Sequence, residues 1–287
     1  MRSRMEGQAE VKTLLELIRS CATDLPKDVE AALHQARDRE SGAARKTLSA
    51  IIRNSGLARR RSVPICQDTG TPVFYVTCPP TADRKSIREG IVKAVRGATG
   101  SVPLRPNAAD PLSGANSGDN TGVNTPPIHF KEWGRDCVRY ELLLKGGGSE
   151  NVTRLYTLPD ARLSALRDIG GVERCVLDAV HKAQGNGCPP YVIGVGIGGM
   201  ADSSIALAKR QLLRVIGDVN PDRELRAFER SMLVKINSLG IGPMGLGGKA
   251  TALAVKAARQ HRHPASYFVA VSFGCWAMRR GAIEVEP

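Results

Sequence analysis

The chain has 287 residues, a length that fits one large domain or two small ones. Hydrophobic residues make up 42% of it and charged residues 24%, a balance that supports a globular core and excludes wholesale disorder. With 41 Lys and Arg against 28 Asp and Glu, the formal net charge is +13, which suits an anionic substrate, an acidic partner or nucleic acid. Aromatic residues are only 4% of the chain, too few for extensive base stacking, so we do not expect nucleic-acid binding.

No apolar stretch approaches the roughly 18 residues that span a bilayer, and Glu16 and Arg19 interrupt the apolar positions near the N-terminus. We therefore expect a soluble, cytoplasmic protein with no membrane partner.

The seven cysteines are an odd number and include no C-x-x-C pair. This argues against a full disulfide framework and against the usual zinc-ribbon or thioredoxin-like sites. Any cysteine-based site must draw its residues from distant segments.

Helical periodicity dominates the first sixty residues. The spacing predicts helices over about 11–21, 28–40 and 43–52, and it places Cys21 in a packed apolar stripe. A turn-rich loop and a strand follow over 63–77, and then a helix over 84–96. Residues 113–127 are nearly all turn formers, and a loop of this length in a compact chain is either disordered or functional. Two strands are predicted after it, near 128–133 and 137–145.

Shorter elements make up the second half. A helix is predicted around 172–180 with Cys175 on its packed face, and a strand over 190–195 leads into a glycine-rich turn and a helix from about 203. A charged helix spans about 223–238, residues 240–248 open a helix over 249–259, and 267–272 form the last strand. Together these elements predict an α+β fold in which mixed sheets are flanked by helices. We expect one domain over 1–287, with 1–60 as its helical N-terminal portion.

Two glycine-rich segments resemble nucleotide-binding loops. Residues 194–199 (GVGIGG) fit the G-x-G-x-x-G pattern between a predicted strand and helix, with Asp218 beyond them. Because the chain lacks alternating strands and helices on both sides, we favour a tight glycine turn that lets the backbone approach another group; a dinucleotide-binding oxidoreductase remains a remote alternative. The segment ending at Lys249 fails as a phosphate loop, since Pro243 replaces the leading glycine and Ala250 the Ser or Thr.

Three cysteines stand out because they lie in loops or at a strand end. Cys66 precedes a predicted strand, Cys188 precedes two prolines, and Cys275 follows the last predicted strand. The proline after Cys188 favours an extended backbone at that cysteine and stiffens the loop. Spacing alone leaves open whether the three converge on one metal centre or are unrelated buried thiols.

Six sequence blocks, in order from about residue 60 to residue 283, resemble the iron–sulfur hydro-lyase family. They are PICQDTGTP, ANSGDNTG with the following TPP, KGGGSEN, CPPYVIGVGIGG, LGIGPMGLGGKATALAV and CWAMRRG. More narrowly, they are similar to the α subunits of two-subunit class I fumarate hydratases and L(+)-tartrate dehydratases. The resemblance implies a [4Fe–4S] cluster held by Cys66, Cys188 and Cys275, with one iron lacking a protein ligand. That open iron would act as a Lewis acid toward the substrate's hydroxyl and one carboxylate.

The same resemblance implies residues that contact substrate. Gln67 and Asp68, next to the first cysteine, match a substrate-contacting pair, and a turn in which Asp68 bonds its own backbone is the structural alternative. Arg105, in LRPN, matches an arginine that binds a substrate carboxylate, a role suited to its planar fork; a surface arginine is the alternative.

The glycines at 146–148 match a backbone approach to the substrate, with Gly147 and Gly148 as our candidates. His263 matches an active-site histidine, and the alignment prefers it to His261 two positions earlier. Asp68 and His263 are therefore the catalytic candidates.

A β subunit is the implied partner, because the chain stops at Pro287, before the second domain that single-chain relatives carry. We expect a hetero-oligomer such as α2β2, an active site at the α–β interface, and no activity without the partner. The resemblance also implies that the substrate is a small C4 dicarboxylate. GGGSEN and GPMGLGGKATALAV look more like fumarase α subunits, whereas CWAMRRG looks closer to the tartrate enzymes. We favour reversible hydration of fumarate to (S)-malate, with conversion of L(+)-tartrate to oxaloacetate as the alternative.

Overall fold

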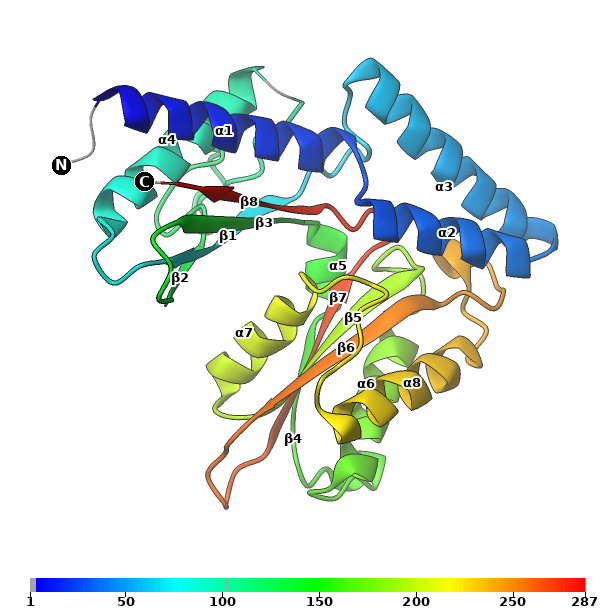
Figure 1. The fold of residues 1–287 in the computed structure, drawn as a ribbon. Helices are drawn as coiled ribbons and strands as arrows, with labels where there is room; N and C mark the ends of the chain where they lie inside the picture. The colour runs from blue at the N-terminus through cyan, green and yellow to red at the C-terminus, as the bar shows by residue number, and fades with distance from the viewer. Residues whose placement is uncertain (1–3, 102, 287) are drawn as a thin grey trace. The chain divides into compact units, whose positions relative to one another are not determined.

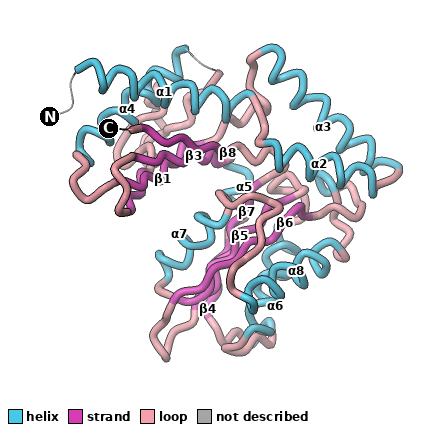
Figure 2. Tube along the Cα trace, in the orientation of Figure 1, coloured by secondary structure: helices cyan, strands magenta, loops and turns pink. Residues whose placement is uncertain are grey.

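A computed structural model describes residues 4–101 and 103–286 of the protein (Figures 1 and 2). The described chain divides into two compact units, and both are discontinuous in sequence. The first unit contains residues 4–26, 54–101, 103–146 and 279–286, and the second contains 27–53 and 147–278. In the described part of the chain, none of the helices combines the length and the apolarity that crossing a bilayer requires.

The first unit is built on a four-stranded mixed sheet in the order β2-β1-β3-β8. Its strands are β1 (Thr71–Cys78), β2 (Ile128–Glu132), β3 (Val138–Lys145) and β8 (Arg280–Val285). Strand β1 is parallel to β2 and antiparallel to β3, and β3 is antiparallel to β8. The helices α1 (Arg4–Thr23) and α4 (Arg84–Ser101) pack on each other and share one hydrophobic core with this sheet.

The second unit holds another four-stranded mixed sheet, in the order β4-β7-β5-β6. Its strands are β4 (Arg154–Thr157), β5 (Tyr191–Gly198), β6 (Ala252–Gln260) and β7 (Phe268–Gly274). Helix α7 (Ala201–Gln211) packs on one face, while α6 (Ile169–Ala183) and α8 (Arg223–Asn237) cover the other (Figure 1). Successive residues of β5 point to opposite faces of the sheet. Ile193, Val195 and Ile197 point to the face that α6 and α8 cover, and they belong to the same hydrophobic core as these helices.

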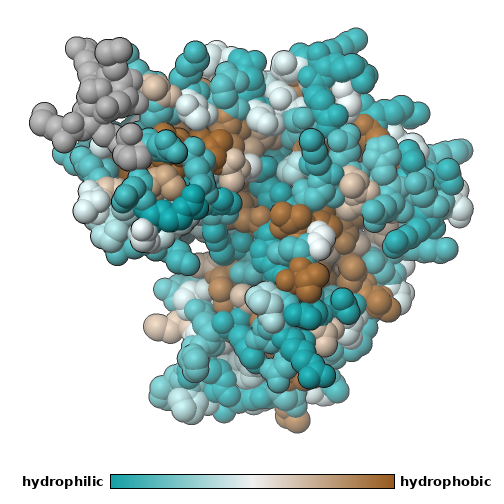
Figure 3. Space-filling model, viewed as in Figure 1, coloured by the Kyte–Doolittle hydropathy of each residue, from teal (hydrophilic) through white to brown (hydrophobic). Residues whose placement is uncertain are grey.

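The other α-helices of the described chain are α2 (Lys27–Arg39), α3 (Gly42–Arg61) and the short α5 (Gly147–Asn151). Two short 3₁₀ helices cover Ala161–Leu163 and Pro243–Gly245. Helix α2 contacts β6, and α5 contacts β7. In Figure 3, hydrophobic side chains gather near the middle of the view over β6 and the loop between α7 and α8. The half-exposed Val215 and Val219 belong to that loop.

The α+β prediction is confirmed, including the helical N-terminal portion and the mixed sheets. Cys21 and Cys175 lie in the two hydrophobic cores, as their helical stripes predicted. Residues 113–127 form no helix or strand and contain only isolated bridges. The single domain over 1–287 stays a prediction beside the two compact units.

Two predictions about the C-terminal part are wrong. The helix predicted over 249–259 is the strand β6, and 267–272 is not the last strand, since β8 follows and pairs with β3. The alanines of ALAVKAARQ repeat at helical spacing, but β6 runs parallel to β5 and is buried along most of its length. A strand covered on both faces shows a near-continuous apolar run, which periodicity cannot distinguish from a buried helix.

The glycine-rich turn predicted at 194–199 begins later than expected, because Gly194 and Gly196 lie inside β5. Only Gly198 and Gly199 have positive φ. The predicted close approach of the backbone is present, and the group approached is helix α7. A Cβ on Gly194 would lie 2.1 Å from the carbonyl oxygen of Ala208, and one on Gly196 would lie 2.2 Å from that of Ser204. These glycines therefore serve the packing of α7 on the sheet.

Gly196→Ala should lower the free energy of unfolding by about 1–3 kcal/mol, because the added methyl group forces α7 away from β5. Urea unfolding followed by circular dichroism measures the change. Gly90→Ala in α4 is the matched control, since a Cβ there meets no atom within 4 Å. This control should leave stability unchanged or raise it by up to about 1 kcal/mol. Equal effects of the two substitutions would contradict the packing explanation.

Candidate functional site

The loop between α3 and β1 carries the first group of predicted site residues. Cys66 and Asp68 are half-buried there, and Gln67 is exposed. The loop is attached at its start, where the Ile65 amide donates to the carbonyl of Ala22 at 3.0 Å. This bond within the first unit anchors the loop that carries the three side chains.

The loop also ends in a turn held by its own side chain. Asp68 Oδ1 accepts a hydrogen bond from the Gly70 amide at 2.9 Å, so the turn that we named as the structural alternative is present. Gly70 has φ +82° and packs so closely on β3 that a Cβ would lie 2.8 Å from the carbonyl carbon of Leu144. Only glycine fits both the conformation and the contact.

Arg105 lies beside this loop in the first unit. Its amide donates to Thr69 Oγ1 at 3.1 Å, and Thr69 is fully buried, whereas the Arg105 side chain is exposed. Asn107 Nδ2 donates to the same Thr69 oxygen at 3.0 Å. Asn120, from the ANSGDNTG block, donates through Nδ2 to the Arg105 carbonyl at 2.9 Å. Thr69, Asn107 and Asn120 therefore hold the backbone of Arg105 beside Thr69, the residue that follows Asp68. Sequence reasoning did not single out these three polar residues.

In the second unit, Cys188 lies in the loop before β5 and departs from the extended backbone that we predicted. Its φ is +59°, a conformation that costs an L-residue about 1–2 kcal/mol. Hydrogen bonds on both sides hold it there: its amide donates to the Gly185 carbonyl, and its carbonyl accepts from the Trp276 amide, both at 3.0 Å. These two bonds outweigh the local preference imposed by Pro189.

The bond from Trp276 also brings two predicted ligands together, because Trp276 directly follows Cys275 at the end of β7. Cys188 and Cys275 are both half-buried. Burial raises the pKa of the nearby Tyr191 hydroxyl to about 12; the hydrogen bond with the Gly187 amide opposes this rise, and Cys188 and Cys275 add to it. Gly148, exposed in α5, lies near the same loop, since a Cβ on it would lie 3.4 Å from the Asn186 carbonyl. Gly147 is exposed beside it.

His263 lies elsewhere in this unit. It belongs to the connection between β6 and β7, and its side chain is exposed, with Nδ1 accepting from the Ala265 amide at 3.1 Å. Arg262 Nη1 donates to the carbonyls of His263, Pro264 and Ser266, which keeps this connection compact. His263 precedes β7 and Cys275 follows it, so the strand separates them by about 20 Å. The structure therefore does not bring His263 to the two cysteines of its own chain.

None of the seven cysteines, all of which lie in the described part of the chain, forms a disulfide. Among residues 4–101 and 103–286, no group of three or more His, Cys, Asp or Glu side chains is arranged to hold a metal ion. The second unit brings two of the three proposed ligands together, and the third, Cys66, belongs to the first unit. Thiolates are the donors that iron–sulfur clusters use, so the residue types fit such a group.

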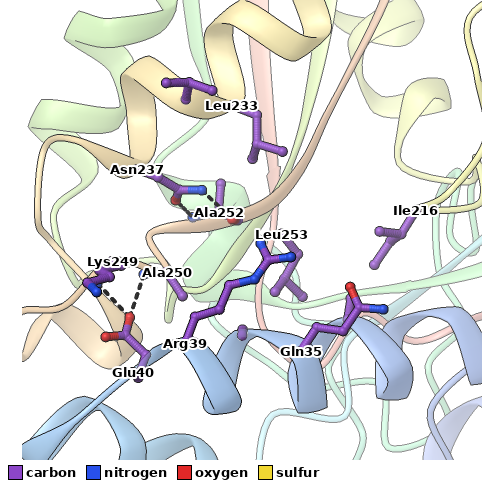
Figure 4. Close-up of a pocket in the computed structure, with 13 residues that line it drawn as sticks. Gln35, Arg39, Glu40, Ile216, Leu233, Asn237, Lys249, Ala250, Ala252 and Leu253 are labelled. Atoms are coloured by element: carbon purple, nitrogen blue, oxygen red, sulfur yellow. Dashed lines mark hydrogen bonds between the residues drawn. The ribbon is translucent and has the colours of Figure 1, made fainter.

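A cavity of about 410 Å³ in the second unit contains none of the predicted site residues (Figure 4). Residues of α2, α8 and β6 line it, with Leu233 and Leu253 among the apolar ones. The buried Glu40 at its rim accepts from the amides of Lys249 and Ala250, at 2.5 and 2.6 Å. This carboxylate accepts hydrogen bonds from two backbone amides just before β6, so Glu40 has a structural role.

Known proteins resemble the whole chain. The profile of the family described as fumarate hydratase (fumerase) matches residues 11–284. A putative class I fumarate hydratase of Geobacillus stearothermophilus is 44% identical over 282 residues, which are 96% of this chain and 55% of the relative. A putative L(+)-tartrate dehydratase α subunit of Methanocaldococcus jannaschii is 42% identical over 279 residues, covering 95% of this chain and 96% of that subunit. The L(+)-tartrate dehydratase α subunit of Escherichia coli K12 is 32% identical over 298 positions, covering 100% and 95%.

The chain thus spans about half the length of the fumarate hydratase relative and nearly all of the two α subunits. Both the family profile and the pairwise similarity extend over almost every residue that the structure describes. The chain therefore belongs to the fumarate hydratase (fumerase) family.

Proposed function

We propose that this chain is the α subunit of a [4Fe–4S] hydro-lyase that catalyses the reversible hydration of fumarate to (S)-malate. The observation that carries the proposal is the pairing of the Cys188 and Cys275 segments through the Trp276 amide, in a chain that belongs to this family. Two half-buried thiols that form no disulfide and lie at adjacent loop ends suit cluster binding better than packing. Thiolate ligands also suit the reducing cytoplasm, where we place the protein.

Cys66, Cys188 and Cys275 would hold the cluster, which supplies an open iron as a Lewis acid when it is bound. The exposed guanidinium of Arg105 would bind one substrate carboxylate, since its backbone is fixed beside the Cys66 loop. Gln67 and Asp68, on that loop, would orient the hydroxyl or the leaving water.

The glycines at the start of α5 would complete the substrate contacts. Gly147 and Gly148 are exposed, so their backbone can approach a substrate without a side chain in the way. Tartrate remains the second candidate substrate, because the two relatives that match over nearly their full length carry the tartrate dehydratase name. The dinucleotide alternative has lost its support, since Gly194 and Gly196 pack against α7.

Protein purified without oxygen should contain about four iron and four acid-labile sulfide atoms per chain. Cys66→Ser, Cys188→Ser and Cys275→Ser should each lose most of both, because each removes one of three thiolates. Iron and sulfide assays with the visible absorption of the cluster measure this. Cys137→Ser is the matched control, since Cys137 is equally half-buried. Wild-type protein that holds no cluster after anaerobic reconstitution would overturn the ligand assignment.

Turnover should require a β subunit. The cluster-loaded chain alone should convert neither fumarate nor L(+)-tartrate, and addition of the partner should restore activity on one of them. Coupled spectrophotometric assays of malate and oxaloacetate distinguish the two substrates. Appreciable turnover by the pure, partner-free chain would show that the site is complete in this subunit.

His263 can act at the proposed site only from a second copy of the chain, because β7 separates it from Cys275. Complexes of His263→Asn chains alone, or of Cys275→Ser chains alone, should be inactive. A randomly assembled mixture of both variants should regain up to about a quarter of wild-type activity. About half of its paired chains join one copy of each variant, and one of the two sites in such a pair combines an intact cysteine with an intact histidine. Kinetic assay of co-expressed, differently tagged chains measures this. Absence of any recovery in verified mixed complexes would contradict the role.

A further inference from the structure

Arg279 is the most deeply buried large polar residue of the first unit. Its side chain is 1% exposed, and it lies directly before β8, four residues after Cys275 in the sequence. Its Nη1 donates to the backbone carbonyl of Asp68 at 2.5 Å, while its Nε is buried without a hydrogen-bond partner. A guanidinium with five donors has thus been taken out of water to reach one carbonyl.

No ion pair joins Arg279 to a carboxylate within the described part of the chain. The neighbouring Cys21 thiol does not compensate the charge either. Burial raises the pKa of Cys21 to about 12, although the charges of Arg279 and Arg280 oppose the rise, so this thiol is neutral near pH 7. Burying an uncompensated cation is unfavourable, and a purely structural position would be filled better by an apolar side chain.

The contact falls at the middle of the loop that carries the proposed site. Asn54 Nδ2 donates to the Ile65 carbonyl at 2.7 Å on one side of Cys66, and Arg279 holds the Asp68 carbonyl on the other. Between these two attachments lie only Cys66 and Gln67, before Asp68 itself. Without the second attachment, the segment that carries Cys66, Gln67 and Asp68 would next be held at the buried Thr69, whose hydroxyl accepts from Arg105 and Asn107.

We propose that Arg279 is a positioning residue that fixes the Cys66–Gly70 loop, and so presents Cys66 and Asp68 in the conformation that the site requires. The identity of that site rests on the proposed function, whereas the effect of Arg279 on the loop does not. Arg279 acts through the charge-assisted hydrogen bond that its guanidinium donates to the Asp68 carbonyl.

The test uses the metal-free chain, in which a pulse of iodoacetamide followed by mass spectrometry measures the alkylation rate of each cysteine. Arg279→Met should raise the rate at Cys66 about tenfold, because a charge-assisted hydrogen bond no longer opposes opening of the loop. The rates at Cys188 and Cys275, in the second unit, should change less than about twofold. Arg279→Lys, which keeps the charge and one donor, should give an intermediate rate.

Arg280→Met is the matched control, since it removes the same charge one residue further along, and it should leave Cys66 near the wild-type rate. Thermal unfolding identifies any variant that fails to fold; if Arg279→Met does, the comparison rests on Arg279→Lys. An unchanged rate at Cys66 in a folded Arg279 variant would overturn the proposal.

In the loaded complex with its partner, the folded Arg279 variant should lower kcat much more than it raises KM while iron content is retained. A structural role alone would lower stability and leave this ratio unchanged. A wild-type chain without iron would refute the proposed function but would leave the alkylation result intact, so the two failures are distinguishable.

Discussion

The antiparallel pairing of β5 with β7 decides which candidate residues share one end of the second unit. Val192 pairs with Gly274, so the residues before β5 and those after β7 emerge at the same edge of the sheet. That register places Cys188 and Cys275 near each other although 87 positions separate them in sequence, from 188 to 275. The same pairing carries the β6–β7 connection, with His263, to the opposite edge. The sheet of the second unit therefore brings Cys188 and Cys275 together and separates both from His263.

Close backbone contacts support this arrangement. Gly194 and Gly196 let α7 lie directly on β5, and the Ser204 hydroxyl donates to the Gly196 carbonyl at 3.1 Å. The sheet can then be covered on both faces, with α6 and α8 on the other side. Cys188 keeps a positive φ because the Trp276 and Gly185 bonds attach it to that covered sheet. Strain at a candidate ligand is thus offset by hydrogen bonds whose positions the register of β5 and β7 determines.

Sequence patterns correctly predicted the elements whose pattern of apolar and polar residues is typical of a single kind of secondary structure. Amphipathic helices such as α2 and α8, and the buried cysteines Cys21 and Cys175, follow from spacing alone. Strand β6 was missed because alanine fits a helix face and a covered strand equally well. Arg279 was missed because burial of an arginine leaves no mark on local sequence, and its partner Asp68 is 211 residues away. The conformation of Cys188 likewise depends on Trp276, not on its neighbours in the chain.

The two interpretations of Asp68, a turn residue and a substrate contact, are compatible. Its Oδ1 accepts the Gly70 amide and its carbonyl accepts Arg279, while the next residue, Thr69, holds the Arg105 backbone. The turn therefore orients the carboxylate instead of competing with its proposed role, since a carboxylate has a second oxygen. The buried arginine and the exposed one act on adjacent residues of one loop. A loop fixed in this way loses little entropy when a substrate binds, which is how preorganisation favours binding and catalysis.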